Sequence, residues 1–119
     1  MSWKKSSEGL KDMLEQLLEN YNCVKKKMFG SDAYFVNNNM FAGVHQDTIF
    51  LRFSENDKNS IMESYDEIIP FEPMEGRIMH EYLAVPESIA TDEKDISLLI
   101  RRSFEYASSL PEKKRKKRN

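Results

Sequence analysis

The chain has 119 residues, a hydrophobic content of 39 %, and 1 Trp, 5 Tyr and 7 Phe. These values exclude an intrinsically disordered protein and leave room for a single domain with its own core. The one cysteine excludes an internal disulfide, and no apolar run approaches the roughly 18 residues of a membrane span. No apolar segment follows the basic residues at the start, so we expect no secretory signal and a soluble cytoplasmic protein.

Charge divides the chain into two unequal parts. Six of the 18 Lys and Arg residues stand in a row at 113–118, whereas all 20 Asp and Glu residues precede them. The first 112 residues therefore carry 12 cations and a net charge of −8. A run of like charges repels itself and buries no apolar surface, which predicts a disordered basic tail at 112–119 beside an acidic domain at 1–111. The predicted nucleic-acid-binding residues are Lys113, Lys114, Arg115, Lys116, Lys117 and Arg118.

The first predicted element is an amphipathic helix. Apolar residues recur from Leu10 to Tyr21 with the three- and four-residue spacing of one helical face. We expect Ser6 or Ser7 to cap its start, and Asn20 and Asn22 to mark its end.

Short apolar segments separated by turn residues come next, and they predict an antiparallel meander. We expect strands at 24–28, 33–36, 40–45 and 48–53. The three asparagines at 37–39 predict a hairpin turn, because asparagine tolerates positive φ. Gln46-Asp47 predicts a second, weaker turn.

A second helix and a short strand are predicted in the middle of the chain. Ser54 can cap a helix that runs to about residue 65, with Asp57 at its third position. The segment at 67–71 predicts a short strand, and the prolines at 70 and 73 place it at an edge of the sheet.

A strand at 77–85, a helical turn that Pro86 opens, and a last helix complete the chain. Thr91 or Asp92 caps the last helix and Pro111 stops it. The order is a helix, four strands, a helix, two strands and a helix. The predicted fold class is α+β, with two layers: an antiparallel sheet of five to six strands and three helices.

Four short motifs, taken in order, have a familiar pattern. Met28-Phe29-Gly30 is followed by Ser31, and Met79 begins a Met-x-x-Tyr-x-x-Val-Pro-Glu run. The two motifs between them are Met40-Phe41-Ala42 and Ile49-Phe50-Leu51-Arg52. Together they resemble the N-terminal domain of the TfoX/Sxy family of bacterial competence regulators, over about residues 8–115. Ser31 stands where that family has the second glycine of Met-Phe-Gly-Gly.

The resemblance implies a small α+β domain similar to secretion-chaperone folds, which agrees with the predicted elements. Named members of the family promote the expression of DNA-uptake genes together with the cyclic-AMP receptor protein. The resemblance therefore implies a regulatory protein and not an enzyme, with no catalytic residue to carry over. The longer regulators have an additional C-terminal helical domain, and we expect this chain to be a single-domain member of the family.

Patterns for catalysis or metal binding fail at decisive positions. His80-Glu81 begins like His-Glu-x-x-His, but position 84 is Ala. Cys23, His45 and His80 lie in different elements without the spacing of metal ligands. The chain has no Gly-x-Ser-x-Gly elbow and no glycine-rich phosphate loop. We expect no enzyme, no cofactor and no metal.

Aromatic and basic residues on the strands have two interpretations. The aromatic residues are Phe29, Tyr34, Phe35, Phe41, Phe50 and Phe53. Exposed rings on a sheet can stack bases, but we favour a core role for most of them, with one or two exposed. The lysines at 25–27 either extend a basic patch or protect an edge strand, and we favour the edge.

Two functions from different classes remain. The first is a regulatory or adaptor domain, linked to transcription or competence, whose basic tail weakly attracts a polyanion. Its partner would be nucleic acid or a transcription-associated protein, and not a membrane. The alternative is a protein-interaction module, chaperone-like or a homodimer through its sheet, with no nucleic-acid role.

Overall fold

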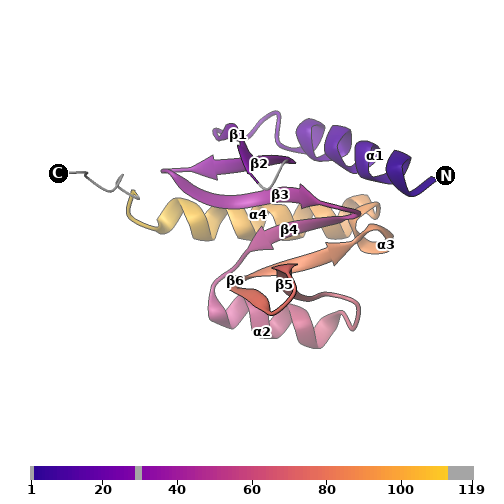
Figure 1. The fold of residues 1–119 in the computed structure, drawn as a ribbon. Coiled ribbons are helices and arrows are strands. Elements are labelled where there is room, and N and C mark those ends of the chain that lie inside the picture. Colours follow the sequence, from indigo (N-terminus) through magenta and orange to yellow (C-terminus); the bar gives the residue numbers. More distant parts are fainter. Residues whose placement is uncertain (1, 29–30, 113–119) are drawn as a thin grey trace.

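The computed structural model describes residues 2–28 and 31–112, which form one antiparallel sheet with helices packed against it (Figure 1). The strands are β1 (Val24–Met28), β2 (Ser31–Val36), β3 (Asn39–His45), β4 (Thr48–Arg52), β5 (Ile69–Met74) and β6 (Arg77–Pro86). The helices are α1 (Ser2–Leu17), α2 (Glu55–Ser64), α3 (Glu87–Ala90) and α4 (Glu93–Ser109). In the sheet the strand order is β1-β2-β3-β4-β6-β5.

This architecture confirms the predicted α+β class. Strands β1 to β4 pair with their neighbours in sequence order, so the predicted meander is correct. β5 contains both prolines and lies at an edge, as predicted, and its pairing with β6 is irregular around Pro70 and between Phe71 and Met74. The predicted helical turn after Pro86 is α3, a fourth helix of 4 residues. No helix in the described part of the chain is long and apolar enough to span a bilayer.

The predicted ends of the first helix were wrong. α1 begins at Ser2, before both proposed capping serines, and ends at Leu17. No proline lies between Ser2 and Leu10, so the backbone can continue through Ser6, Ser7 and Gly9, although glycine lowers the local helix propensity. At the other end, Leu18 is still buried although a turn has replaced the helix there. The apolar spacing therefore indicates which residues are buried, and these continue past Leu17, the last residue of the helix.

The predicted caps of the two later helices are confirmed. The Ser54 hydroxyl accepts a hydrogen bond from the Asp57 amide at 3.2 Å. Asp92, and not Thr91, caps α4, because its carboxylate accepts from the Asp95 amide at 3.2 Å. Each bond satisfies an amide that would otherwise lack a partner in the first helical turn.

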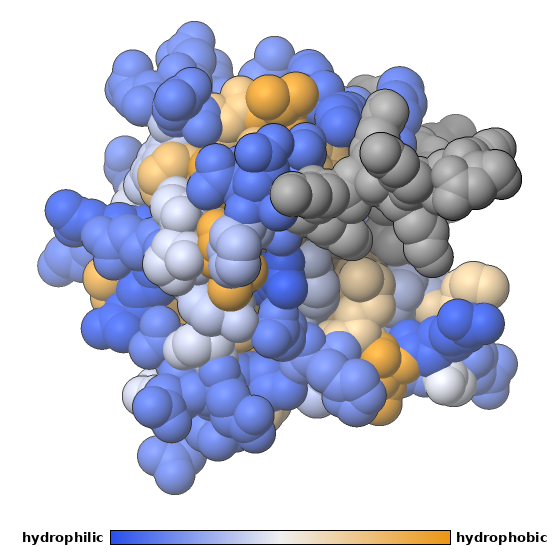
Figure 2. Space-filling model, turned by 90° about the vertical axis from the view of Figure 1, so that its left-hand side faces the viewer, coloured by the Kyte–Doolittle hydropathy of each residue, from blue (hydrophilic) through white to orange (hydrophobic). Residues whose placement is uncertain are grey.

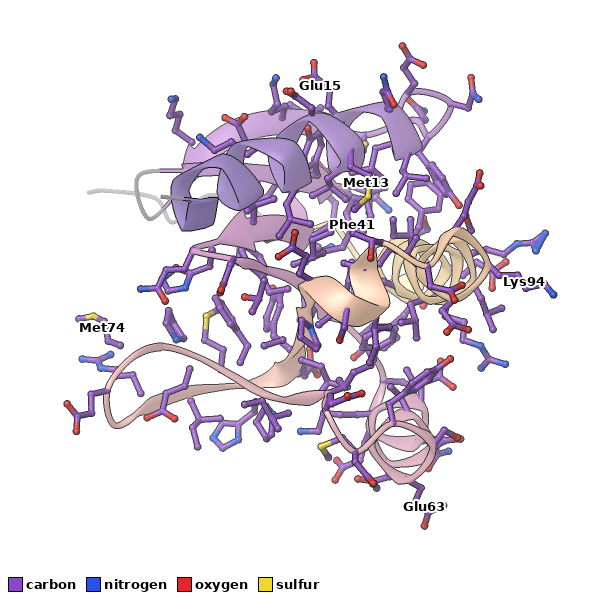
Figure 3. The ribbon with its side chains drawn as sticks, turned by 90° about the vertical axis from the view of Figure 1, so that its right-hand side faces the viewer. Met13, Glu15, Phe41, Glu63, Met74 and Lys94 are labelled. Carbon is purple, nitrogen blue, oxygen red and sulfur yellow. The ribbon has the colours of Figure 1, made fainter. Side chains whose placement is uncertain are left out.

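One face of the sheet carries the main hydrophobic core beneath the helices. α1 and α4 both contact β3 and β4, while α2 contacts β6. The largest buried side chains from the two layers are Leu10, Leu14, Phe41, Ile49, Leu51, Phe53, Leu83, Ile96, Leu99 and Ile100. Phe41 lies between the helices and the sheet in Figure 3. Its ring meets that of Phe104 edge to face, with centroids 5.5 Å apart.

A second, smaller core lies on the opposite face of the sheet. The ring of Phe71, from β5, stacks on that of Phe50, from β4, with centroids 4.5 Å apart. Gly43 leaves room for this stack, since a Cβ there would lie 2.3 Å from the Phe50 ring. The β5–β6 hairpin, with Met74 near its tip, projects on this side of the molecule, away from Lys94 of α4 (Figure 3). The hairpin thus covers part of the face that the helices leave open.

We expect Gly43→Ala to destabilise the fold. The added methyl group would displace the Phe50 ring and loosen its stack on Phe71. Overpacking of this kind should lower the free energy of unfolding by about 1–3 kcal/mol in urea denaturation.

Gly9→Ala is the matched control. Gly9 lies in α1, and a Cβ there would meet no atom within 4 Å. This substitution should leave stability unchanged or raise it by up to about 1 kcal/mol, because alanine favours the helix. Equal stability of Gly43→Ala and the parent chain would contradict the assigned role of Gly43.

Candidate functional site

The six predicted nucleic-acid-binding residues at 113–118 lie outside the described residues. The structure does describe the segment directly before them, residues 108–112, and hydrogen bonds hold this segment at the β2–β3 turn. The side-chain amide of Asn37 donates to the Ser108 carbonyl at 3.2 Å, and that of Asn39 donates to the Pro111 carbonyl at 3.1 Å. The side-chain amide of Asn38 donates to the Glu112 carboxylate at 3.3 Å. We call these three residues, Asn37, Asn38 and Asn39, the asparagine clamp.

The clamp forms because asparagine suits both the turn and the contact. Asn37 and Asn38 have positive φ values of 54° and 63°, which most other side chains resist. Asn39 is 6 % exposed, and its amide also donates to the Asn37 carbonyl at 3.1 Å. Figure 1 shows this turn beside the C-terminal end of α4. The basic run therefore begins next to one end of the sheet.

The three lysines of β1 lie on an edge strand, as predicted. They pair with Tyr34, Ala33 and Asp32 in turn, so they lead away from the β2–β3 turn. Lys25 contacts Glu15 at 3.4 Å and Asp32 at 4.0 Å, so two carboxylates oppose its charge. Lys26 points to the opposite face, where its ammonium group lies 5.1 Å from the centroid of the Phe35 ring. Lys26 is exposed, and this geometry is a cation–π contact.

Burial confirms the core role predicted for most of the aromatic residues. Tyr34, Phe41, Phe50 and Phe53 are buried, whereas Phe29 lies outside the described residues. Phe35 is half-buried. Strand alternation, which places Tyr34 under the helices, turns Phe35 to the other face of the sheet. Strand alternation in the sequence indicates that Tyr34 and Phe35 face opposite sides of the sheet, but it does not indicate which of the two rings is the more exposed.

A polar cluster that the sequence did not predict joins β4, β6 and α4. Arg52 Nε donates to Glu81 Oε1 at 2.7 Å, and the Tyr106 hydroxyl donates to the other oxygen of Glu81 at 3.0 Å. Next to these bonds, the buried hydroxyl of Ser103 donates to the Phe41 carbonyl at 3.0 Å and accepts from the backbone amide of Arg52. These bonds connect the helix to the sheet.

The tyrosines around this cluster are held in their neutral form. Burial and the hydrogen bond to Glu81 raise the pKa of Tyr106. Burial also raises the pKa of Tyr82, whose hydroxyl donates to the Met40 carbonyl at 2.8 Å. On the helix side of the sheet, burial and then Glu15 raise the pKa of Tyr34 to about 12. A raised pKa favours a hydrogen-bond donor over a general base at neutral pH.

The cysteine and the histidines do not come together. Cys23 lies between α1 and β1, His45 ends β3 and His80 lies in β6. Burial raises the pKa of the Cys23 thiol. Within residues 2–28 and 31–112 no three His, Cys, Asp or Glu side chains are arranged to hold a metal ion. A groove of about 570 Å³ separates α1 from α3 and the start of α4. Its lining consists of Met13, Gln16, Leu17, Glu19, Ala90, Thr91, Glu93 and Ile96, a set without a nucleophile paired to a base.

The surface near the C-terminal end of α4 is mainly hydrophilic. Figure 2 shows this side of the molecule with small, separate hydrophobic patches among polar residues. The described residues there include the asparagine clamp and the carboxylate of Glu112.

We expect Asn39→Ala to release the C-terminal segment. Asn39 is buried, and the substitution would remove the amide that donates to the carbonyls of Pro111 and Asn37. The loss of these hydrogen bonds should lower the free energy of unfolding by about 1–3 kcal/mol. Amide hydrogen exchange should also quicken at Leu110, which bonds to the Ala107 carbonyl.

Asn59→Ala is the control for this change. Asn59 is exposed in α2, so its removal should alter stability by no more than about 0.5 kcal/mol. If Asn39→Ala exchanged and unfolded like the parent chain, the clamp would have no anchoring role.

Residues 15–107 match the family model described as the TfoX N-terminal domain. The match covers most of the chain, including every strand and most of α4. No curated protein sequence matches the chain.

Proposed function

Because the chain belongs to the TfoX N-terminal domain family, we propose that it is a non-enzymatic regulatory or adaptor domain, linked to transcription or competence, that weakly attracts nucleic acid. One observation carries the proposal. The six cations at 113–118 follow a domain with a net charge of −8 over residues 1–112. A separation of charge this sharp favours a polyanion as the partner of the basic run.

The asparagine clamp supports this proposal. It binds residues up to Glu112, so the cations start at a defined place on the domain. Nucleic acid attracted to them would then be brought to one end of the sheet. The negative charge of the domain opposes close approach, so affinity should be low at physiological salt.

The polar groups of the described residues support a role without catalysis. The Arg52–Glu81–Tyr106 bonds use both oxygens of the carboxylate, and the nearby tyrosines have raised pKa values. The groove between α1 and α4 brings no paired acid and base together. A partner-binding role requires only the surface and the basic run.

The proposal is tested by binding to labelled duplex DNA over a salt series. The full chain should show a log–log salt slope of roughly −5 if all six cations contact phosphates. The same chain stopped at Glu112 keeps the clamp contacts but lacks the cations, so it should bind at least about tenfold more weakly at low salt. A slope near zero, or equal binding by the two chains, would contradict the proposal.

The second candidate function is protein interaction without nucleic acid. Exposed apolar side chains on the β5–β6 hairpin favour it: Ile69, Met74 and Ile78 are 56 %, 62 % and 50 % exposed. Such residues are common at protein–protein contacts. A mass that rises with concentration, combined with no binding to DNA, would select this function over the first.

A further inference from the structure

The sheet has two edge strands, and they differ in their capacity to pair with a further strand. β5 contains Pro70 and Pro73, which have no backbone N–H, and its pairing with β6 is irregular. β1 contains no proline and pairs with β2 in an unbroken register from Val24 to Met28. In the described part of the chain β1 pairs with β2 alone, at the opposite end of the sheet from β5 (Figure 1). The outer side of β1 is therefore the edge that can extend the sheet.

The side chains of β1 are exposed and mostly cationic. Val24 is 57 % exposed, and Lys25, Lys26 and Lys27 are exposed beside it. Strand alternation places Lys25 and Lys27 on the helix side of the sheet, and Val24 and Lys26 on the other side. Three consecutive cations are a local exception on a domain with a net charge of −8 over residues 1–112. We call the outer side of these four residues the β1 edge.

Part of the charge of the β1 edge already has a partner within the domain. Lys25 contacts the carboxylates of Glu15 and Asp32 at 3.4 and 4.0 Å. The Lys26 ammonium group lies over an aromatic ring, a contact that brings no opposite charge to it. None of the ion pairs between described residues involves Lys27. A carboxylate from another molecule would therefore be attracted most strongly by Lys26 and Lys27.

The lysines oppose pairing of β1 with a second copy of itself. In an antiparallel pair of two β1 strands centred on Lys26, the two copies of Lys26 would be opposite, and each Lys25 would be opposite a Lys27. Like charges directly opposite one another destabilise a strand pair. The same positions favour a strand that has carboxylates opposite the lysines and an apolar side chain opposite Val24. The lysines thus disfavour one partner and select another.

We propose that the β1 edge binds an extended acidic segment of another protein, which adds an antiparallel strand to the sheet. Backbone hydrogen bonds form the new ladder, and the side chains determine which segment is accepted. Opposite Lys27, Lys26, Lys25 and Val24 in turn, the segment has three acidic residues followed by an apolar one. This inference goes beyond the attraction of nucleic acid, because it involves no residue of the basic run.

The test uses synthetic peptides of about eight residues, blocked at both ends, with Glu-Glu-Glu-Val at the centre. Titration of the full chain with this peptide should shift the amide signals of residues 24–27 and of the β2 residues paired with them. A peptide with Gln-Gln-Gln-Val should bind about fivefold or more weakly at low salt, since it lacks the carboxylates.

Peptide N-methylation separates strand addition from attraction by charge alone. Two versions of the glutamate peptide carry N-methyl groups on alternate residues, in one phase or the other, and both retain every carboxylate. In an antiparallel strand only alternate residues direct their N–H groups toward the neighbouring strand. One of the two versions should therefore bind about tenfold or more weakly than the unmodified peptide, and the other should bind like it.

Lys27→Gln should weaken binding of the glutamate peptide by about two- to fivefold, the effect of one exposed ion pair. Lys94→Gln is the matched control, because Lys94 is exposed at the start of α4 (Figure 3), and it should bind the peptide like the parent chain. Thermal unfolding of each variant checks that the fold persists. The shifts at β1 should also remain in the chain stopped at Glu112, which retains the whole of β1.

Four results would overturn the inference. Equal binding of the two N-methylated peptides would mean that charge alone attracts the peptide and no strand is added. Shifts that vanish in the chain stopped at Glu112 would assign the peptide to the basic run. A dimer that occupies β1 without peptide would assign the edge to a second copy, and an absence of shifts at β1 would leave the edge without a partner of this kind. The salt series with duplex DNA is independent of all four, so the proposed function can fail or hold separately.

Discussion

The stack of Phe71 on Phe50 determines which part of the sheet remains available to a partner. A six-stranded sheet has two faces, and the helices of this domain cover one of them. The second face would be open without the β5–β6 hairpin, which places the Phe71 ring over that of Phe50. Gly43 has no side chain that would displace the Phe50 ring. Because the hairpin is attached at the β6 side of the sheet, its cover weakens toward β1. Ala33 of β2 is still fully buried on this face, whereas Val24 of β1 is 57 % exposed.

A second constraint, the asparagine clamp, acts on the distribution of charge. Opposite charges at the two parts of the chain would attract one another wherever the basic run could reach the acidic domain. The clamp instead fixes the preceding residues at the β2–β3 turn by three side-chain hydrogen bonds. On the neighbouring strands, alternation directs Asp32 to the helix side and leaves Lys26 on the other.

Most of the fold could be predicted from local sequence signals, and the surface could not. The asparagines at 37–39 indicated a turn because of their backbone preference, and the structure confirms it with positive φ at Asn37 and Asn38. The ends of α1 were missed because the apolar spacing continues into a buried turn at Leu18. The side-chain bonds from the asparagines to residues 108–112, and the Arg52–Glu81–Tyr106 cluster, join positions far apart in the chain. No local pattern carries that information, since it depends on how the layers meet.

The central claim is that the basic run at 113–118 attracts nucleic acid to the end of the sheet where the asparagine clamp binds residues 108–112. Amide chemical shifts of the full chain during titration with a short oligothymidylate test it most directly. The account predicts shifts concentrated at residues 37–39 and 108–112, with little change along the groove between α1 and α4. Shifts confined to residues after Glu112, or centred on that groove, would contradict it.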